Sequence, residues 1–354
     1  MGWNDVNVWA RRAVAAAAAA ALLGGGYGGY AWIKEQTPGD RLAEACNGML
    51  PVDAVLALTG TTAGGFGGGD LELTSNAYDV SAGVSEPDGL PVACRANDLQ
   101  MRIETASGSG SAFDAYTFHR HGTRLPIPLT GGWSGFLVAA DEQELGATVL
   151  LDCPNWDRRT GAGVLVTVER GDTDSGDASV RRGVARLAAA IAERAARHTG
   201  CAGDPGGSIG QLASPGAADP VDAERADGTC KGVASHPTVR ETPARTAPVE
   251  FCALGDSLQL RAYYGPFVRG EGDERYGDWE RPSGTSAYAV WGSAACGGAL
   301  GDAVFAARPA EDSGRDLRSA PLTPSEYADL RHFAEASAQR HDCSAPELPA
   351  APRD

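Results

Sequence analysis

The chain has 354 residues, 43% of them hydrophobic, so it is long enough to form two ordinary domains with apolar cores. It carries 46 acidic and 30 basic residues, which give a formal net charge of −16. A surface this negative repels phosphate groups and therefore argues against a nucleic-acid partner. No phosphate-binding loop, dinucleotide fingerprint or H-E-x-x-H motif occurs in the sequence, so we expect no cofactor and no metal.

An uncharged stretch near the N-terminus predicts a transmembrane helix. Residues 13–33, AVAAAAAAALLGGGYGGYAWI, follow Arg11 and Arg12. As a helix this stretch is about 31 Å long, which matches a hydrocarbon core of about 30 Å. The two arginines keep residues 1–12 in the cytoplasm. Residues 34–40 then form a juxtamembrane segment, and the bulk of the chain lies outside the cell as a single-pass membrane protein.

A cleaved signal peptide is the alternative, because Gly29 and Ala31 form a small-x-small cleavage site. The protein is secreted if residues 1–31 are removed. Both alternatives export the chain to an oxidising compartment, where disulfides are the default state of paired cysteines. The sequence has an even set of eight cysteines, which are Cys46, Cys94, Cys153, Cys201, Cys230, Cys252, Cys296 and Cys343.

The cysteines form two groups of four, and the sequences around them repeat. CRANDLQMR in the first group corresponds to CALGDSLQLR in the second, and AARHTGC corresponds to AQRHDC. Such landmarks, in the same order in both halves, predict a duplicated unit. We expect an extracytoplasmic domain 1 at 41–201, an exposed linker at 202–226, a related domain 2 at 227–343 and a disordered tail at 344–354.

Four cysteines in each unit allow three pairings, which sequence alone does not separate. The nearly equal separations of Cys153 from Cys201 and of Cys296 from Cys343 favour a strand tied to the last turn of a helix packed on its sheet. The favoured disulfides are Cys46–Cys94, Cys153–Cys201, Cys230–Cys252 and Cys296–Cys343.

Each unit is predicted to be α+β, with helices covering an antiparallel sheet. In the second unit, the sequence TPSE predicts a helix that begins at a capping box, in which Thr323 is the N-cap and Glu326 its partner. The elements expected in the first unit are a helix at 51–58, strands at 99–104, 135–139, 148–151 and 164–169, and a closing helix at 178–198.

The letters GDSL in CALGDSLQLR resemble the motif of GDSL hydrolases. That resemblance implies an esterase with Ser257 as nucleophile, His332 as base and Asp329 as the residue that orients it. The family also needs an asparagine between the serine and the histidine, and none follows Asn155. The repeat aligns Ser257 with Asp98, so we interpret Ser257 as a turn residue.

The stretch RHGTRLP resembles the signature of histidine acid phosphatases. The resemblance implies that His121 takes up a phosphoryl group, that Arg120 and Arg124 neutralise it, and that His341 with Asp342 donates the proton. The stretch lies in the middle of a four-cysteine unit, and the second unit has no counterpart. The competing interpretation is a basic hairpin loop, which we favour.

Two histidines precede cysteines at the predicted helix ends, His198 before Cys201 and His341 before Cys343. Zinc sites usually contain closely spaced pairs such as C-x₂-C, which are absent from the sequence. A histidine in the last turn of a helix interacts favourably with the helix dipole, which favours a structural role.

The whole arrangement resembles the uncharacterised single-pass, cysteine-paired extracytoplasmic proteins of Streptomyces-like actinobacteria. The resemblance covers the anchor, the C-x-G-(M/V) openings and the R-H helix ends, and it implies a location and no activity. We expect a non-enzymatic, membrane-tethered protein whose two domains bind a cell-envelope ligand or another protein. An exported phosphatase-like enzyme is the second hypothesis, and a GDSL-type esterase is the third.

Overall fold

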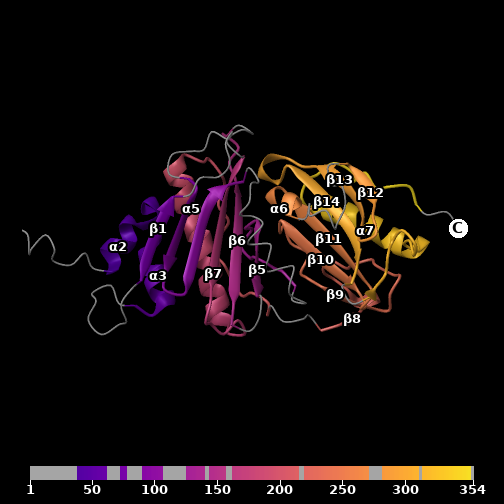
Figure 1. The fold of residues 1–354 in the computed structure, drawn as a ribbon, viewed down its shortest axis with the longest axis horizontal. Coiled ribbons are helices and arrows are strands. Elements are labelled where there is room, and N and C mark those ends of the chain that lie inside the picture. Colours follow the sequence, from indigo (N-terminus) through magenta and orange to yellow (C-terminus); the bar gives the residue numbers. More distant parts are fainter. Residues whose placement is uncertain are drawn as a thin grey trace, which may run out of the picture.

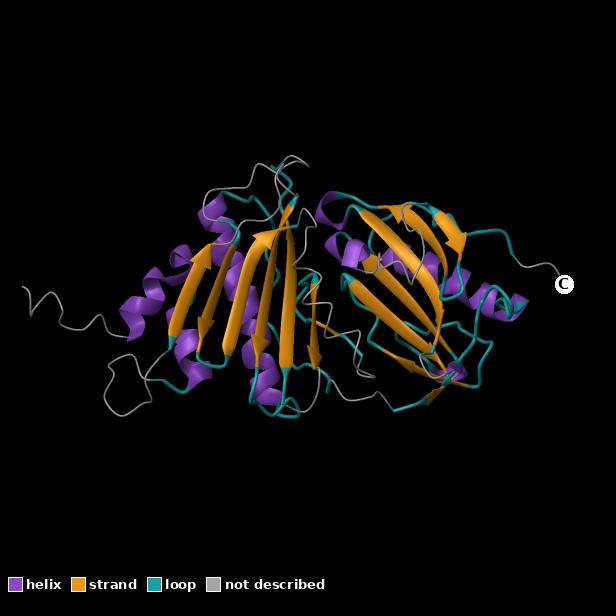
Figure 2. Cartoon of the chain, in the orientation of Figure 1, coloured by secondary structure: helices purple, strands orange, loops and turns teal. Residues whose placement is uncertain are grey.

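The computed structural model describes residues 38–61, 72–77, 90–106, 125–139, 143–156, 162–214, 219–270, 281–310 and 313–351. Within these ranges the chain is an α+β protein with two antiparallel sheets of seven strands each (Figure 1). In each unit the long closing helix, Ala178–Thr199 or Pro324–Arg340, lies against one face of the sheet (Figure 2).

The predicted membrane span at 13–33 lies outside the described residues. Among the helices that the structure describes, none is by itself long and apolar enough to cross a membrane. One pair, Gly39–Gly48 and Val52–Thr59, meets the length and composition requirement only when combined, and it is bent by 118°.

The first sheet has the strand order β1-β2-β3-β7-β6-β5-β4, and all neighbours are antiparallel. Alternating residues explain the strands, since β3 buries Leu99, Met101 and Ile103 and points the residues between them to the other face. The strands are β1 (Leu73–Ala77), β2 (Val92–Ala96), β3 (Leu99–Thr105), β4 (Ile127–Pro128), β5 (Gly135–Ala139), β6 (Leu145–Asp152) and β7 (Gly163–Arg170).

Four helical segments belong to this unit: α2 (Pro38–Glu44), η1 (Ala45–Gly48), α3 (Val52–Thr59) and α5 (Ala178–Thr199). The closing helix α5 packs on β6 and β7. It begins at Asp177, whose carboxylate accepts a hydrogen bond from the Ser179 backbone N–H at 2.7 Å. It ends at Gly200, which adopts the left-handed conformation with φ of 68°. The predicted closing helix is therefore confirmed.

The second sheet has the order β12-β13-β14-β11-β10-β9-β8. Its strands are β8 (Val221–Asp222), β9 (Thr238–Glu241), β10 (Val249–Leu254), β11 (Leu258–Tyr264), β12 (Ser283–Thr285), β13 (Val290–Ala295) and β14 (Asp302–Pro309). The helical segments are η2 (Ala223–Arg225), α6 (Pro266–Gly270), η3 (Gly298–Leu300) and α7 (Pro324–Arg340), and α7 packs on β11 and β14.

Six strands follow the same path in both sheets. The order β1-β2-β3-β7-β6-β5 in the first sheet corresponds to β9-β10-β11-β14-β13-β12 in the second. The hydrogen bonds at one sheet end also correspond: the Gly171 N–H donates to the Asp98 carbonyl at 3.1 Å, and the Ala310 N–H donates to the Ser257 carbonyl at 3.0 Å. Asp98 and Ser257 therefore occupy equivalent turns of the two units.

Four disulfides connect the eight cysteines, in the pairs that the sequence spacing favoured. In each unit one disulfide ties the segment before β1 or β9 to β2 or β10. The other ties the residue after β6 or β13 to the end of the closing helix. Four disulfides are typical of proteins in an oxidising or extracellular environment.

The stretch expected to be an exposed linker is partly buried. Ile209 and Leu212 are 3% and 5% exposed and belong to the core of the first unit. The Trp133 indole N–H donates to the Gly207 carbonyl at 2.7 Å, and the Gly207 N–H donates to the Gly131 carbonyl at 2.6 Å. Residues 202–214 thus continue the first unit along its surface.

The tail expected to be disordered is also held in place. The Glu347 N–H donates to the Ser293 carbonyl at 2.8 Å, and the Ser344 N–H donates to the Ala295 carbonyl at 2.8 Å. Leu348 packs against the core of the second unit. These contacts extend the sheet beside β13.

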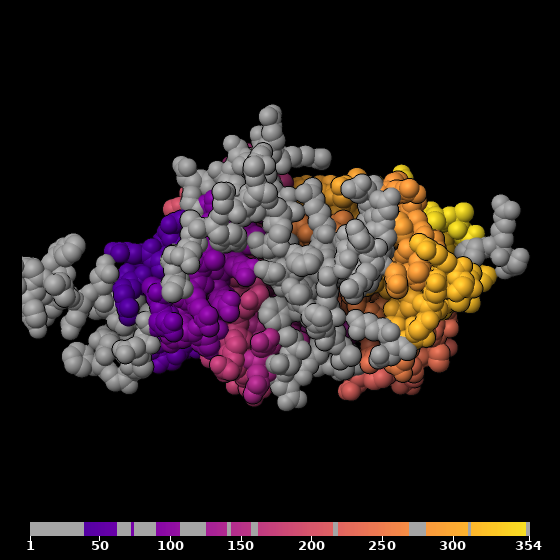
Figure 3. Space-filling view, viewed as in Figure 1, coloured from indigo at the N-terminus to yellow at the C-terminus, as the bar shows by residue number. Residues whose placement is uncertain are grey.

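The two units share an apolar cluster. From the first unit it contains Phe136, Val138, Leu150 and Leu165, on the sheet face opposite α5, and from the second it contains Val249, Tyr263, Phe267 and Ala299. The rings of Phe136 and Phe267 meet edge to face, with their centroids 5.3 Å apart. Asp152 adds a polar contact, because its carboxylate accepts the Ala299 N–H at 2.6 Å. The space-filling view shows the first unit in indigo to magenta beside the second in orange to yellow (Figure 3).

The capping box of α7 forms as predicted and can be tested by mutation. Thr323 Oγ1 accepts the Glu326 N–H at 3.2 Å, and the Glu326 carboxylate accepts the Thr323 N–H at 2.8 Å. We expect T323A to lower the free energy of unfolding by about 1 kcal/mol, measured by urea unfolding of the full-length protein. T323S keeps the hydroxyl and should stay close to wild type. Equal stability of all three proteins would contradict the cap.

Candidate functional site

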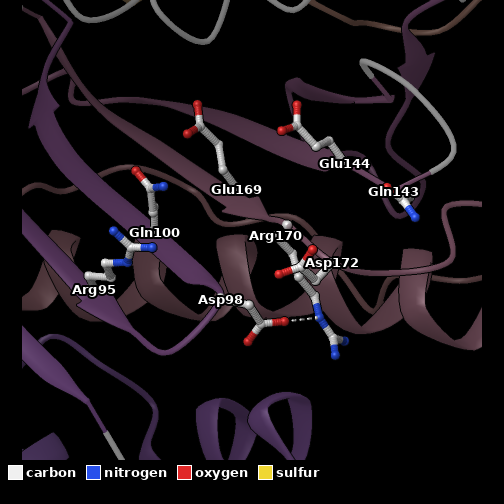
Figure 4. Close-up of a pocket in the computed structure, with 9 residues that line it drawn as sticks. Arg95, Asp98, Gln100, Gln143, Glu144, Glu169, Arg170 and Asp172 are labelled. Carbon is white, nitrogen blue, oxygen red and sulfur yellow. Dashed lines mark hydrogen bonds and ion pairs between the residues drawn. The ribbon is translucent and has the colours of Figure 1, made fainter.

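A charged depression lies at one end of the first sheet. Its volume is about 280 Å³, and it is open to solvent. Every residue that lines it is polar, charged or glycine: Arg95, Asp98, Gln100, Gln143, Glu144, Glu169, Arg170, Gly171 and Asp172 (Figure 4). None of these residues was proposed as a binding residue from the sequence.

The sheet register places three of these side chains in one row. Arg95 on β2 pairs with Gln100 on β3, and Gln100 pairs with Glu169 on β7. Directly paired residues of antiparallel strands point to the same face with Cβ atoms about 5 Å apart, so the three side chains are neighbours. Glu169 is next paired with Gly146 on β6, which has no side chain and leaves space beside the glutamate.

Turns at the same sheet end close the depression. The Arg170 Nε donates to the Asp98 carboxylate at 3.0 Å, which ties the end of β7 to the turn between β2 and β3. The Thr173 N–H donates to the Gln143 carbonyl at 3.0 Å and so ties the segment after β7 to the segment before β6. In Figure 4 the carboxylates of Glu144 and Glu169 point to the same side of the sheet, whereas Asp98 and Arg170 face each other.

The charge balance of the depression is negative. Four carboxylates, those of Asp98, Glu144, Glu169 and Asp172, surround two guanidinium groups. Asp98 pairs with Arg170, and the carboxylates of Glu144, Glu169 and Asp172 line the same depression as the guanidinium of Arg95. An arrangement of this kind attracts groups that carry positive charge and offers amide and guanidinium donors for a polar remainder.

The same place in the second unit has a different composition. The residues at the positions of Arg95, Asp98, Glu169 and Arg170 are Ala253, Ser257, Arg308 and Pro309, as the paired registers show. The fold thus forms this turn and strand end without carboxylates at the positions of Asp98 and Glu169. The charges of the first unit are a property of that unit and not a requirement of the shared topology.

The phosphatase-like residues lie outside the described part of the chain. Arg120, His121 and Arg124 fall between residues 107 and 124. The proposed proton donor His341 is described, and its side chain is 1% exposed. His341 Nε2 lies 3.0 Å from a carboxylate oxygen of Glu250, so this imidazole is held inside the second unit.

The esterase-like residues are described, and they do not form the triad that the motif implies. His332 Nε2 lies 2.9 Å from the Lys231 carbonyl oxygen, and Asp329 accepts the N–H groups of Ala234 and Ser235. Ser257 lies in the predicted turn. Its hydroxyl does bond a histidine, but that residue is His236, with Oγ and Nε2 2.9 Å apart.

A second cavity, of about 220 Å³, lies between the units. Beside it, His341 and Arg340 both bond the buried carboxylate of Glu250, and the Tyr264 ring stacks on the imidazole at 3.9 Å. Burial alone raises the pKa of Glu250, but hydrogen bonds from His341 and Arg340 outweigh it and hold the pKa below its usual value. Burial, with the nearby Glu250 charge, raises the pKa of Tyr264. The cavity is lined by Ser134, Leu150, Asp152, Thr246, Ala299, Leu300, Arg340, His341 and Asp342.

Metal ligands do not converge in the described part of the chain. No group of three or more His, Cys, Asp or Glu side chains there is arranged to hold an ion. His198 and His341 lie at the ends of α5 and α7, and the adjacent cysteines Cys201 and Cys343 are in disulfides. In comparisons with known proteins, no family model, no curated protein and no solved structure matches this chain.

Proposed function

We propose that this chain is a membrane-tethered, extracytoplasmic binding protein whose first unit binds a positively charged peptide segment in the charged depression. The uncharged segment at 13–33 is the proposed tether, with residues 1–12 in the cytoplasm and both units outside the cell. Four disulfides support an oxidising location on that side of the membrane.

The observation that carries the proposal is the unequal composition of two equivalent sheet ends. The first unit gathers four carboxylates in a depression, and at the positions of two of them, Asp98 and Glu169, the second unit has Ser257 and Arg308. Because the fold does not need these charges, a ligand of opposite charge is the best explanation for them. A protein or peptide of the cell envelope with exposed Lys or Arg side chains fits this chemistry.

We also infer that the two units arose by duplication. Three observations support it: the common order of six strands, the same two disulfide positions, and the equivalent bonds from Gly171 to Asp98 and from Ala310 to Ser257. After duplication, one copy is free to keep the shared framework while the other acquires charged groups at a loop end.

Binding of tetralysine by the full-length protein in detergent micelles tests the proposed ligand class. We expect measurable binding by isothermal titration calorimetry that weakens as salt is raised, because exposed charges are screened beyond about 8 Å at physiological ionic strength. The double variant E144Q/E169Q should raise the Kd of tetralysine roughly three- to tenfold, since exposed ion pairs contribute about 0.2–1 kcal/mol each.

A charge-matched control separates the site from the overall negative charge. E224Q/E335Q removes two exposed carboxylates from the second unit and should leave the Kd of tetralysine unchanged. Tetraglutamate should not bind any of the proteins. Equal weakening by both double variants would show that tetralysine responds to net charge alone and would overturn the proposed site.

A further inference from the structure

A serine and a histidine in the second unit are placed as a nucleophile and its base. Ser257 lies in the turn between β10 and β11, and His236 lies just before β9, which is the neighbour of β10. The Ser257 Oγ and His236 Nε2 atoms are 2.9 Å apart. Both residues are partly buried, so they are neither locked in the core nor freely solvated. Hydroxyl and imidazole within hydrogen-bonding reach are the arrangement that activates a serine.

The other nitrogen of the imidazole is also held. His236 Nδ1 lies 2.8 Å from the hydroxyl oxygen of Ser235. When the Nδ1–H donates to Ser235, Nε2 has a lone pair and accepts the proton of Ser257. Ser235 thus orients the base, which is the part that a carboxylate takes in many serine hydrolases.

The backbone before the histidine is fixed by a buried carboxylate. Asp329 on α7, 4% exposed, accepts the Ala234 N–H at 2.9 Å and the Ser235 N–H at 2.8 Å. The helix is therefore linked through residues 234–236 to the turn that holds Ser257. Ser235 and Asp329 are positioning residues, since neither touches the reacting hydroxyl.

The turn itself does not need this pair. In the first unit the equivalent turn contains Asn97 and Asp98, and it is secured by the ion pair of Asp98 with Arg170 and by the Asn97 side chain, which accepts the Glu72 N–H at 2.9 Å. The turn of the second unit has an ion pair of Asp256 with Arg240 and, in addition, the serine–histidine pair, which the equivalent turn of the first unit lacks.

We infer that Ser257 is a reactive nucleophile that His236 activates, and that it accepts acyl groups from esters. In the first step Ser257 Oγ bonds to the acyl carbon, its proton passes to His236 Nε2, and the ester's alkoxide leaves with that proton as an alcohol. In the second step water attacks the acyl-serine, gives a proton to His236, and releases the carboxylic acid while Ser257 regains its hydrogen. No oxidant or co-reactant other than water is required.

The serine's own amide is a donor for the developing oxyanion. The Ser257 N–H makes only a long contact with the Leu254 carbonyl, at 3.4 Å. Such a weakly engaged donor beside the attacking oxygen can turn to the acyl oxygen as it becomes negative. The inference concerns the second unit only and does not rest on the proposed binding site in the first.

Covalent labelling of the full-length protein with a biotin-tagged fluorophosphonate tests the inference. In this reaction Ser257 Oγ displaces fluoride from phosphorus and the proton passes to His236. We expect mass spectrometry to locate the adduct on Ser257 in the folded protein and not in the heat-denatured protein. S257A should not be labelled there, and H236N should be labelled at least about 100-fold more slowly, since general-base catalysis contributes 10²–10⁴-fold.

Two further variants keep the result decisive. H332Q changes a histidine of the same unit that bonds Lys231, and it should be labelled at the wild-type rate. If H236N fails to fold, S235A tests the inference in its place. S235A retains both reacting groups, and its Ser257 should be labelled more slowly because the imidazole is no longer held in position. An unlabelled Ser257 in the folded protein, or equal rates with and without the intact pair, would overturn the inference. Loss of tetralysine binding alone would leave it unaffected.

Discussion

Replacing Phe267 with alanine is expected to destabilise the protein by about 3–5 kcal/mol, the usual cost of truncating a buried phenylalanine. Phe267 is fully buried, and its ring meets that of Phe136 across the contact between the units. The free energy of unfolding is measured by unfolding the full-length protein with urea in micelles and monitoring its tryptophan fluorescence.

A double-mutant cycle shows whether this loss includes the contact between units. If Phe136 and Phe267 pack on each other in solution, F136A/F267A should cost less than the two single variants together, by about 0.5–1.5 kcal/mol for the aromatic pair. F251A serves as a control, because Phe251 is half-buried on β10 and outside the shared cluster, and it should be additive with F136A. Strict additivity of F136A with F267A would mean that the units do not share a core.

Local sequence signals predicted the parts of the fold that depend on neighbouring residues. The capping box at Thr323 and Glu326 involves one turn of helix, so its residues are sufficient to specify it. Two of the disulfides, Cys153–Cys201 and Cys296–Cys343, were favoured by their nearly equal separations, although the sequence left the other pairings open. The capping box is determined by chemistry that a short window of sequence contains, whereas cysteine pairing depends on how distant elements pack.

The packed linker was not predictable in the same way. Glycine, proline and alanine dominate residues 202–214, and only Ile209 and Leu212 carry large apolar side chains there. Two isolated apolar residues form no period that indicates a strand or a helix. Their burial depends on Trp133 and Gly131, which are distant in the sequence and meet the segment only in the folded unit.

The candidate sites depend on strand order, which explains why the sequence indicated them only in part. Arg95, Gln100 and Glu169 become neighbours because β7 inserts beside β3, more than sixty residues later in the chain. His236 was missed as the partner of Ser257 because the motif implies a histidine downstream, whereas β9 places one upstream beside the turn. The sequence predicted a strand at 99–104 but not which distant residues converge on its face.

Neutralising Glu250 is expected to have a second large effect, because this carboxylate is the acceptor at the centre of a buried network. Glu250 is 1% exposed, and it bonds both Arg340 and His341. E250Q leaves the Arg340 charge without its partner in a partly buried place, and the loss of a buried pair costs about 3–5 kcal/mol. The equivalent position in the first unit is Val92, so the fold does not require a carboxylate there.

The pH dependence of stability distinguishes lost charge from lost packing. Burial raises the pKa of Glu250, but the hydrogen bonds from His341 and Arg340 bring it below the value of 4.5 that an unfolded chain has. The Glu250 carboxylate therefore binds a proton less readily in the folded state than in the unfolded state. The stabilisation from the network is fully present above pH 4.5, and it is lost as the pH falls through the folded pKa of Glu250. The free energy of unfolding of the wild type should fall in this acid range, and Glu250 should contribute up to about 1.4 kcal/mol per pH unit to that fall. E250Q should lack that component while keeping the part due to Glu326, whose pKa is also lowered. Burial raises the pKa of Glu326, but the hydrogen bonds from Arg315 and Thr323 and the charge of Arg315 together outweigh it. An unchanged acid slope in E250Q would show that Glu250 is not ionised in the folded protein.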